Sequence, residues 1–207
     1  MNSANPSRVR ARERLLDSAG RLFAERGLDG VTVREIAADA GVGHAGVNYH
    51  FRTKADLYRE VLRLHGPKPG QGVASLEDDG SREAALQHLK AWIRGFAMQA
   101  TTAPDAVAQG LIRHELLRPE GPSEEVFQAV IRPHHEGLER LIARVRPDLD
   151  DTDVRVAAIG IISQGLVYRL TRPMTLRNLG VTDLDQDLLA RISERLLTNA
   201  LGGLDLD

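Results

Sequence analysis

Residues 32 to 54, TVREIAADAGVGHAGVNYHFRTK, carry the clearest structural pattern in the N-terminal part of the chain. Thr32 and Glu35 stand three residues apart, the spacing at which a hydroxyl and a carboxylate each satisfy a free amide at the start of a helix. A helix should therefore begin at Val33 and end at Gly41, because glycine takes the left-handed conformation that a sharp turn needs. A second short helix is predicted for residues 44 to 50.

These two short helices have the pattern of a DNA-binding helix-turn-helix. Val47 and Phe51 should face inward, which leaves short or polar side chains on the outer faces of the second helix. Such a helix can lie close to base edges and phosphates in a major groove. The candidate base contacts are His44, Ala45, Gly46 and Asn48, and the candidate phosphate contacts are Tyr49 and His50. The alternative is a small helical subdomain that never touches DNA.

A longer pattern carries a family resemblance. The run T-V-x-E-I-A-x-x-A-G-V, followed by N-Y-H-F-x-x-K-x-x-L-Y, resembles the DNA-binding domain of the TetR family of bacterial transcription regulators. The match covers residues 8 to about 64. It implies that Lys54, at the start of the next helix, reaches a DNA phosphate. One departure is Gly43, where many relatives have Ser or Thr, and glycine caps a helix less well by a few tenths of a kcal/mol.

Residues outside the second helix are also assigned to the DNA interface. They are Thr32, Arg34 and Arg8. The first predicted helix carries Arg8, Arg10, Arg12 and Arg14 in its first turns, where cations oppose the helix dipole. A phosphate contact would compensate for this, and a solvated arginine face is the alternative.

Composition and charge limit the class of protein. The chain has 207 residues, of which 42% are hydrophobic and only 4% aromatic, as in an aliphatic helical core. The absence of cysteine excludes a disulfide scaffold and a thiolate metal site. No apolar run is long enough to span a membrane, and the first residues lack the apolar segment of a signal peptide. We therefore expect a cytoplasmic protein with no membrane partner.

The charge differs between the two parts of the chain. Residues 1 to 68 hold 12 Lys/Arg and 8 Asp/Glu, a balance of +4, so the remaining residues hold 15 and 21, a balance of −6. A basic N-terminal part suits DNA, and an acidic remainder does not. The Gly- and Pro-rich residues 66 to 80 form the joint. The prediction is a DNA-binding domain at residues 1 to 65 and a ligand-sensing and dimerisation domain at residues 66 to 207.

Helical periodicity predicts an all-α fold, with a three-helix helix-turn-helix head and a C-terminal helical bundle. Ser81 and Asp183 are predicted to cap helices, and Pro133 should kink the helix that contains it. About nine helices are expected, at residues 8–26, 33–40, 44–50, 54–65, 81–101, 104–117, 123–145, 152–171 and 183–201.

The last two predicted helices are assigned to a homodimer interface. The first of them is apolar on more than one face between residues 156 and 162, and the second repeats leucine and isoleucine at seam-like spacing. Close approach of a partner helix is favoured by Gly160, Ser163, Gly165 and Gly202. A two-fold dimer would present two recognition helices about 34 Å apart, or a multiple of that, to a palindromic operator. The alternative is that both helices only close the monomer core.

The segments LIRHELLRP, VIRPHHEGLERLIARV and LVYRLTRP resemble the CecR-type branch of the TetR family. This resemblance implies an all-helical dimer with a small-molecule pocket, and it leaves the ligand open. Pockets between bundle helices combine aromatic and polar groups, although aromatic residues at helical spacing also build cores and ion pairs are often structural. The candidate ligand-binding residues are Trp92, Phe96, Arg113, Glu115, Phe127, His134, Gln164 and Tyr168.

Enzyme chemistry is weakly signalled. The chain has no HExxH, GxSxG or dinucleotide-binding pattern, and a metal site made from His114, His134, His135, Glu136 and Glu139 is weak because adjacent histidines on a helix diverge by about 100°. We therefore expect no cofactor and no enzyme activity. The predicted function is a ligand-responsive DNA-binding regulator, most readily a repressor that a small organic effector releases from its operator. The alternatives are a ligand-independent architectural DNA-binding protein and a metal-dependent enzyme.

Overall fold

The computed structural model describes residues 6–65, 79–102, 105–118 and 123–206, and every regular element within these ranges is a helix. The predicted all-α fold is confirmed. None of the described helices has the length and apolar character needed to cross a membrane. The chain divides into two compact units, unit 1 from Met1–Pro67 with Asp105–Val130 and unit 2 from Lys68–Pro104 with Ile131–Asp207.

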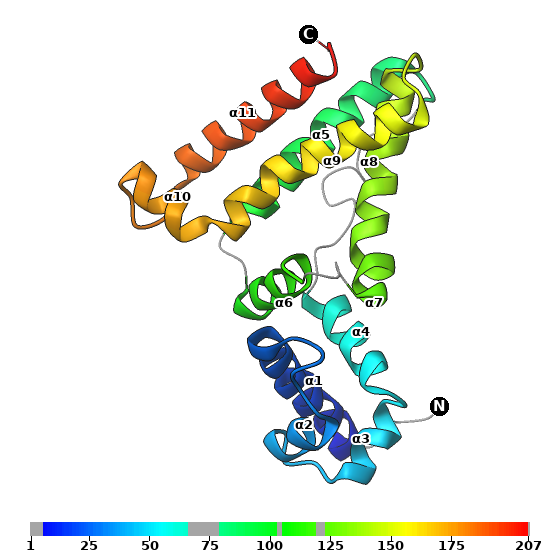
Figure 1. Cartoon of the computed structure of the whole chain (residues 1–207), viewed down its shortest axis with the longest axis vertical. Coiled ribbons are helices and arrows are strands. Elements are labelled where there is room, and N and C mark those ends of the chain that lie inside the picture. The colour runs from blue at the N-terminus through cyan, green and yellow to red at the C-terminus, as the bar shows by residue number, and fades with distance from the viewer. Residues whose placement is uncertain (1–5, 66–78, 103–104, 119–122, 207) are drawn as a thin grey trace. The chain divides into compact units, whose positions relative to one another are not determined.

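Unit 1 begins with four helices, drawn blue to cyan in Figure 1. They are α1 (Pro6–Arg26), α2 (Val33–Asp39), α3 (His44–His50) and α4 (Lys54–His65). The long helix α1 packs against the other three. Its Phe23 meets Tyr58 of α4 edge to face, with ring centroids 4.9 Å apart, and both side chains are fully buried. This aliphatic and aromatic core fixes the short helices, which would be unstable alone at this length.

Two further helices belong to unit 1, namely α6 (Ala106–Leu116) and α7 (Glu124–Val126). Helix α6 packs against α1 and α4, and α7 contacts α4. Asp105 caps α6 by accepting a hydrogen bond from the Val107 amide, and His65 at the end of α4 contacts the Asp105 carboxylate at 2.5 Å. The compact units therefore do not coincide with the functional division predicted at residues 65 and 66. That division stays a prediction.

Unit 2 is a bundle of five helices, α5 (Arg82–Thr101), α8 (Arg132–Val145), α9 (Asp151–Leu170), α10 (Arg172–Leu179) and α11 (Gln186–Gly203). Helix α5 packs against α8, α9 and α11, so it is the centre of the bundle (Figure 1). Ser81 caps α5 as predicted, because its hydroxyl oxygen accepts from the Ala84 amide at 3.0 Å. Asp150 caps α9 through the amides of Thr152 and Asp153. The apolar faces of these helices form a continuous core that contains Leu89, Ile93, Leu138, Ile142 and Ala158.

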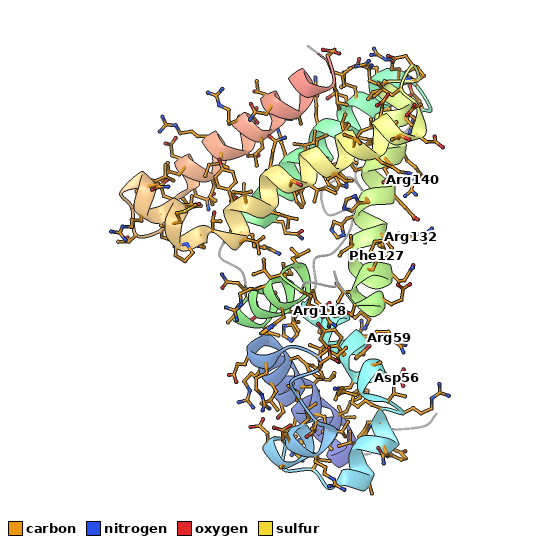
Figure 2. All side chains as sticks on the ribbon, viewed as in Figure 1. Asp56, Arg59, Arg118, Phe127, Arg132 and Arg140 are labelled. Carbon is orange, nitrogen blue, oxygen red and sulfur yellow. The ribbon has the colours of Figure 1, made fainter. Side chains whose placement is uncertain are left out.

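The predicted kink near Pro133 takes the form of a π-helical turn, η1 (Phe127–Ile131), between α7 and α8. Proline lacks an amide hydrogen and its ring collides with the carbonyl four residues earlier, so a regular α-helix cannot continue unchanged through it. One predicted helix is thereby divided into three elements. Phe127, which begins the π turn, is 40% exposed (Figure 2).

The end of the chain differs from the prediction in its cap. Asp185, not Asp183, caps α11, since its carboxylate accepts from the Leu188 amide at 2.9 Å. Asp183 forms an ion pair with Arg172 instead. A further helix, α10, precedes Asp183 and was not predicted. It ends at Gly180, whose backbone adopts the left-handed conformation with φ 69°.

Two features that were assigned to the dimer interface, Gly165 and the apolar row of α11, instead pack within unit 2. A side chain at Gly165 would place its Cβ 2.4 Å from Phe96 Cε1, so this glycine allows α9 to approach α5 rather than a partner. The seam-like apolar row of α11 is buried largely within unit 2, with Leu184, Leu189, Ile192, Leu196 and Leu197 all less than 10% exposed. By contrast, Gly160 and Gly202 are exposed, with open space where a Cβ would stand.

Candidate nucleic-acid interface

The start of α2 is fixed by the predicted capping box, which is confirmed. The Glu35 amide donates to Thr32 Oγ1 at 3.3 Å, and the Thr32 amide donates to Glu35 Oε2 at 2.8 Å. Arg26, the last residue of α1, donates to the other oxygen of the same carboxylate at 2.8 Å. The hydrogen bonds from Thr32, followed by the one from Arg26, lower the pKa of Glu35 from 4.5 to about 2. The carboxylate therefore stays charged and ties α1 to α2.

The turn between α2 and α3 is held from both sides. Gly41 adopts φ 60°, the left-handed conformation expected for it. Arg14 of α1 donates from Nε to the carbonyl of Ala40 at 3.0 Å. A Cβ at Gly46 would stand 2.7 Å from Val42 Cγ1, so the open side of this glycine faces the turn. Gly46 thus serves the packing of α3 on the turn, and only its backbone remains for the predicted base contact.

Helix α3 has one buried and one exposed face. Val47 and Phe51 are 2% and 7% exposed and anchor the helix, as predicted. Ala45, Asn48 and Tyr49 are exposed, with Tyr49 at 67%, which is high for an aromatic side chain. Gly43 precedes the helix without any side-chain cap, and the side chain of His44 lies outside the described residues. Apart from the large Tyr49, the described side chains of this exposed face are short or polar, as a groove-binding helix requires.

His50 lies at the end of this face. Its side chain is half-buried, and its ring meets that of Tyr49 edge to face, with centroids 5.1 Å apart. The two predicted phosphate contacts are therefore next to each other on one side of α3.

The four arginines of the first turns of α1 have different roles. Arg12 forms an ion pair with Glu60 of α4 at 2.5 Å and lies over the Phe51 ring, 5.5 Å from its centroid. Arg14 is bound to the α2–α3 turn, whereas Arg10 is exposed. The side chain of Arg8 lies outside the described residues. Arg12 and Arg14 thus position the helix-turn-helix, a role that the sequence pattern did not reveal because their partners are distant in the chain.

Two further predicted DNA contacts, Thr32 and Arg34, are exposed at the start of α2. The Thr32 hydroxyl also donates to Glu35 Oε2 at 2.6 Å, so it is engaged in the capping box.

Lys54 has partners within the protein. Its ammonium donates to the carbonyls of Leu28 at 2.9 Å and Val31 at 3.0 Å, both in the connection between α1 and α2. An ammonium group has three N–H donors, so one remains for a phosphate. Lys54 therefore links the start of α4 to the segment that leads into α2. The resemblance had implied only the phosphate contact.

Five of the predicted ligand-binding residues lie in unit 2. Trp92 and Phe96 are one turn apart on α5 and stack, with centroids 5.2 Å apart and an interplanar angle of 19°. His134 on α8 is 9% exposed. Gln164 donates to the carbonyl of Gly160 in its own helix at 3.4 Å. Tyr168 of α9 packs against an apolar cluster formed by Ala97 of α5 and by leucine and isoleucine residues at and just before α11. The stacked pair lies on the helix against which α8 and α9 also pack. Its role in ligand binding stays a prediction.

The other three, Arg113, Glu115 and Phe127, lie in unit 1. Arg113 is exposed on α6. Glu115 is only 1% exposed, and its carboxylate accepts from the Tyr58 hydroxyl at 2.5 Å and from the Ser123 amide at 2.7 Å. Burial, and then this hydrogen bond, raise the pKa of Tyr58 far above its usual range. Glu115 therefore joins α4, α6 and α7, and its oxygens are occupied by these internal contacts.

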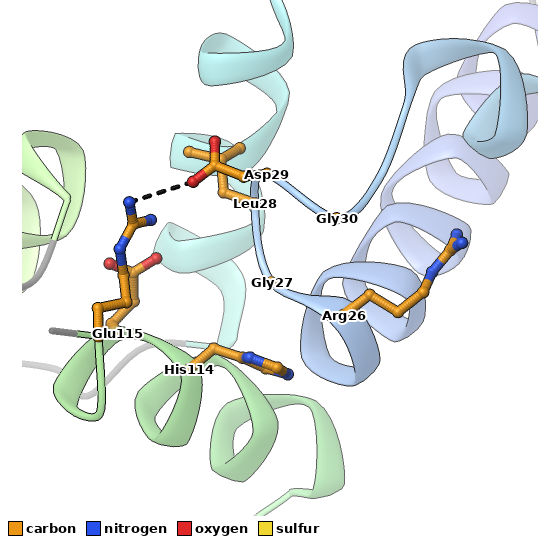
Figure 3. Close-up of a pocket in the computed structure, with 8 residues that line it drawn as sticks. Arg26, Gly27, Leu28, Asp29, Gly30, His114 and Glu115 are labelled. Atoms are coloured by element: carbon orange, nitrogen blue, oxygen red, sulfur yellow. Dashed lines mark ion pairs between the residues drawn. The ribbon is translucent and has the colours of Figure 1, made fainter.

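A pocket of about 280 Å³ lies in unit 1 between the α1–α2 connection and α6 (Figure 3). His114 Nε2 contacts the Glu25 carbonyl at 2.9 Å, and Arg118 forms an ion pair with Asp29 at 3.1 Å, marked by a dashed line in Figure 3. Arg118 and Asp29 thus pair within the wall, whereas the partner of His114 lies outside it. Of the predicted ligand residues only Glu115 lines it. Within the described ranges, no three His, Cys, Asp or Glu side chains come together as a metal site would require.

Comparison with known proteins gives two family matches. Residues 15–61 match the family model described as bacterial regulatory proteins, tetR family. Residues 85–204, more than half of the chain, match the C-terminal domain of the HTH-type transcriptional dual regulator CecR. The first match covers the helix-turn-helix described above. The second begins within α5 and covers most of unit 2 through α11, together with α6 and α7.

Individual proteins are similar along nearly the whole chain. The dual regulator CecR of Shigella flexneri is 29% identical over 197 residues, which is 89% of this chain and 86% of CecR. The fold is shared with NalD, the secondary repressor of the MexAB-OprM multidrug efflux pump in Pseudomonas aeruginosa, with a TM-score of 0.63 and 23% identity over 96% of this chain and 98% of NalD. It is also shared with the Bacillus subtilis regulator FadR in complex with stearoyl-CoA, with a TM-score of 0.59 and 21% identity over 92% and 98% of the two chains.

Proposed function

Because this chain belongs to the TetR family of bacterial regulatory proteins, with a C-terminal domain of the CecR type, we propose that it is a repressor whose homodimer binds a palindromic operator and is released by a small organic effector. That it is a DNA-binding transcription regulator follows from the family itself. Repression, the dimer and the effector go beyond that membership, and each rests on separate support.

The exposed face of α3 carries the DNA-binding part of the proposal. Ala45, Asn48 and Tyr49 project from a helix that is anchored by Val47 and Phe51, and no bulky aliphatic side chain lies on that face. We assign Asn48 to a base edge, because an amide can pair bidentately with adenine in a major groove. Tyr49, His50 and the remaining donor of Lys54 suit phosphates, which position the protein without reading sequence.

A row of exposed apolar and small residues on α9 supports the dimer. Val156, Ile159 and Val167 are 62%, 52% and 54% exposed, which is unusual for large aliphatic side chains on a bundle helix. They lie on one stripe of the helix, with Gly160, Ser163 and Leu170 between or beside them. This stripe, here called the α9 stripe, remains after the apolar row of α11 has been buried within unit 2. A second copy of the chain would cover it and pair two DNA-binding heads.

The effector site is proposed for unit 2, around Trp92 and Phe96. This stacked pair, in which Trp92 is buried and Phe96 half-buried, lies on the central helix of the bundle, where helical proteins commonly bind small molecules. One protein of the same fold supports an effector, because FadR of Bacillus subtilis is complexed with stearoyl-CoA. NalD, which also shares the fold, is a repressor and supports repression.

The test is selection of genomic DNA by the purified full chain. Bound fragments should share an inverted repeat, with half-sites separated by one helical turn or a multiple of it. Asn48→Ala should change the preferred sequence, whereas Asn178→Ala, at an exposed asparagine of α10, should not. A single half-site, or no enrichment, would contradict the dimeric regulator.

Deletion of the gene, followed by measurement of transcripts from the selected promoters, separates repression from activation. Transcripts should rise if the protein is a repressor. A fall at some promoters would favour a second candidate, a regulator with both activities, which the description of CecR as a dual regulator supports. Operator affinity should fall about 5- to 150-fold when the effector binds, so indifference to every compound tested would favour an architectural DNA-binding protein.

A further inference from the structure

Arg169 on α9 is a partly buried cation that has no ionic partner among the residues that the structure describes. One Nη donates to the carbonyl of Gln99 on α5 at 2.8 Å. The Nε atom is buried and has no hydrogen-bond partner, and within the described part of the chain no carboxylate pairs with the guanidinium. Burial therefore lowers the pKa of Arg169, with no opposing charge to offset it. An arginine presents several N–H donors, and only one of them is used here.

The surroundings already hold a second cation at the same helix end. Arg172 donates from Nη1 to the carbonyl of Thr101 at 2.5 Å and forms an ion pair with Asp183. Two guanidinium groups thus bind the last carbonyls of α5, while only one carboxylate accompanies them. The negative end of the helix dipole favours cations, but it is equivalent to only about half an elementary charge. An excess positive charge therefore remains at Arg169.

A buried charge with an unpaired donor is costly unless another group satisfies it. We propose that Arg169 is the anchor for the carboxylate of an organic-acid effector bound in unit 2. This inference rests on the proposed effector site and names the chemical class of its ligand. A carboxylate fits the planar fork of a guanidinium bidentately, and its single negative charge matches the single excess positive charge. A phosphate dianion would leave one negative charge unmatched.

The residues next to Arg169 define the rest of the ligand. Gly165, one turn earlier on α9, lies against the Phe96 ring, which stacks on Trp92. Helix α9 lies alongside α5 here (Figure 1). Helix α9 covers the side of the Phe96 ring at Gly165, and the ring is only half-buried, so an acid held at Arg169 would extend its carbon skeleton along the accessible part of Phe96. The expected class is a monocarboxylate with an aliphatic or aromatic body.

The experiment compares acids with their neutral amides. Octanoate and octanamide, and 3-phenylpropanoate and 3-phenylpropanamide, are titrated into the full chain, and binding is followed by the fluorescence of Trp92, the single tryptophan. The parent should bind each acid about 10- to 100-fold more tightly than its amide, because hydrogen bonds to charged groups are the stronger ones. Arg169→Gln should remove this preference and leave the affinity for the amides unchanged. Arg177→Gln, at an exposed arginine of α10, is the matched control and should keep the preference.

Equal binding of acid and amide by the parent overturns the proposal, and so does a preference that persists in folded Arg169→Gln. If that variant does not fold, Arg169→Lys decides instead. It keeps the charge without the planar fork, so the preference should fall at least about threefold, and an unchanged preference overturns the proposal. Operator binding without any acid is measured separately. Its absence in the parent contradicts the proposed regulator but leaves the acid and amide comparison readable, so the two failures are distinguishable.

Discussion

Replacing Lys54 with methionine, which keeps most of the side-chain volume, tests whether this residue stabilises the DNA-binding head. The change removes the hydrogen bonds to the carbonyls of Leu28 and Val31, at 2.9 and 3.0 Å. Hydrogen bonds from charged groups contribute about 1.5 to 3 kcal/mol each. Because Lys54 is partly exposed, water can satisfy the two carbonyls in part when the ammonium is removed. We therefore expect the free energy of unfolding of the head to fall by about 1 to 3 kcal/mol in total.

Urea unfolding followed by two probes separates the units. Far-ultraviolet circular dichroism reports on all helices, whereas Trp92 is the single tryptophan and lies in unit 2. With a denaturant dependence of about 1 to 3 kcal/mol per molar urea, Lys54→Met should lower the midpoint of the unit 1 transition by about 1 M. The Trp92 transition should stay in place. Arg10→Met, at an exposed arginine of α1, is the matched control.

A midpoint that does not move in Lys54→Met would refute the reasoning, because the carbonyl contacts would then contribute nothing. A second measurement isolates the phosphate contact. If the remaining donor of Lys54 meets DNA, the slope of log affinity against log salt should become shallower by about 0.9 in Lys54→Met. Lys54→Arg, which keeps the charge, should largely preserve that slope.

Three further changes probe other parts of the structure. Ile159→Glu places a carboxylate in the α9 stripe. Because an unpaired charge buried in an interface costs several kcal/mol, this variant should sediment as a helical monomer. A stable dimer would show that the interface does not include the α9 stripe. Gly46→Ala puts a Cβ 2.7 Å from Val42 Cγ1, so it should lower the free energy of unfolding by about 1 to 3 kcal/mol and weaken operator binding. If neither the free energy of unfolding nor the operator affinity changes, α3 can shift without cost. The pKa of Glu35 is lowered to about 2, so the contribution of its capping box is complete above the ordinary pKa of 4.5 and is lost as pH falls toward 2. The unfolding midpoint of the parent should therefore drop more between pH 5 and pH 2 than that of Glu35→Gln, and parallel curves would argue against it.

The helix-turn-helix could be predicted because its signals are local. Thr32 and Glu35 are three residues apart, and Gly41 directly follows the helix it ends, so a short window contains both partners of each interaction. The same reasoning failed for Asp183. Asp183 and Asp185 both carry a carboxylate that can cap a helix. In the folded chain Asp185 caps α11, and Asp183 pairs with the distant Arg172.

Local sequence patterns are enough to predict the all-helical class, the capping box at the start of α2 and the exposed face of α3. The partners of Lys54, Glu115 and Gly165 depend on how distant parts of the chain pack. Lys54 reaches carbonyls 23 and 26 residues away, Glu115 binds a hydroxyl 57 residues away, and Gly165 is adjacent to Phe96 of another helix. A lysine, a glutamate or a glycine stands in the same kind of local sequence pattern whether it faces a ligand, a second chain or the core of its own chain. Long-range packing makes that choice, because burial fixes which groups must satisfy one another.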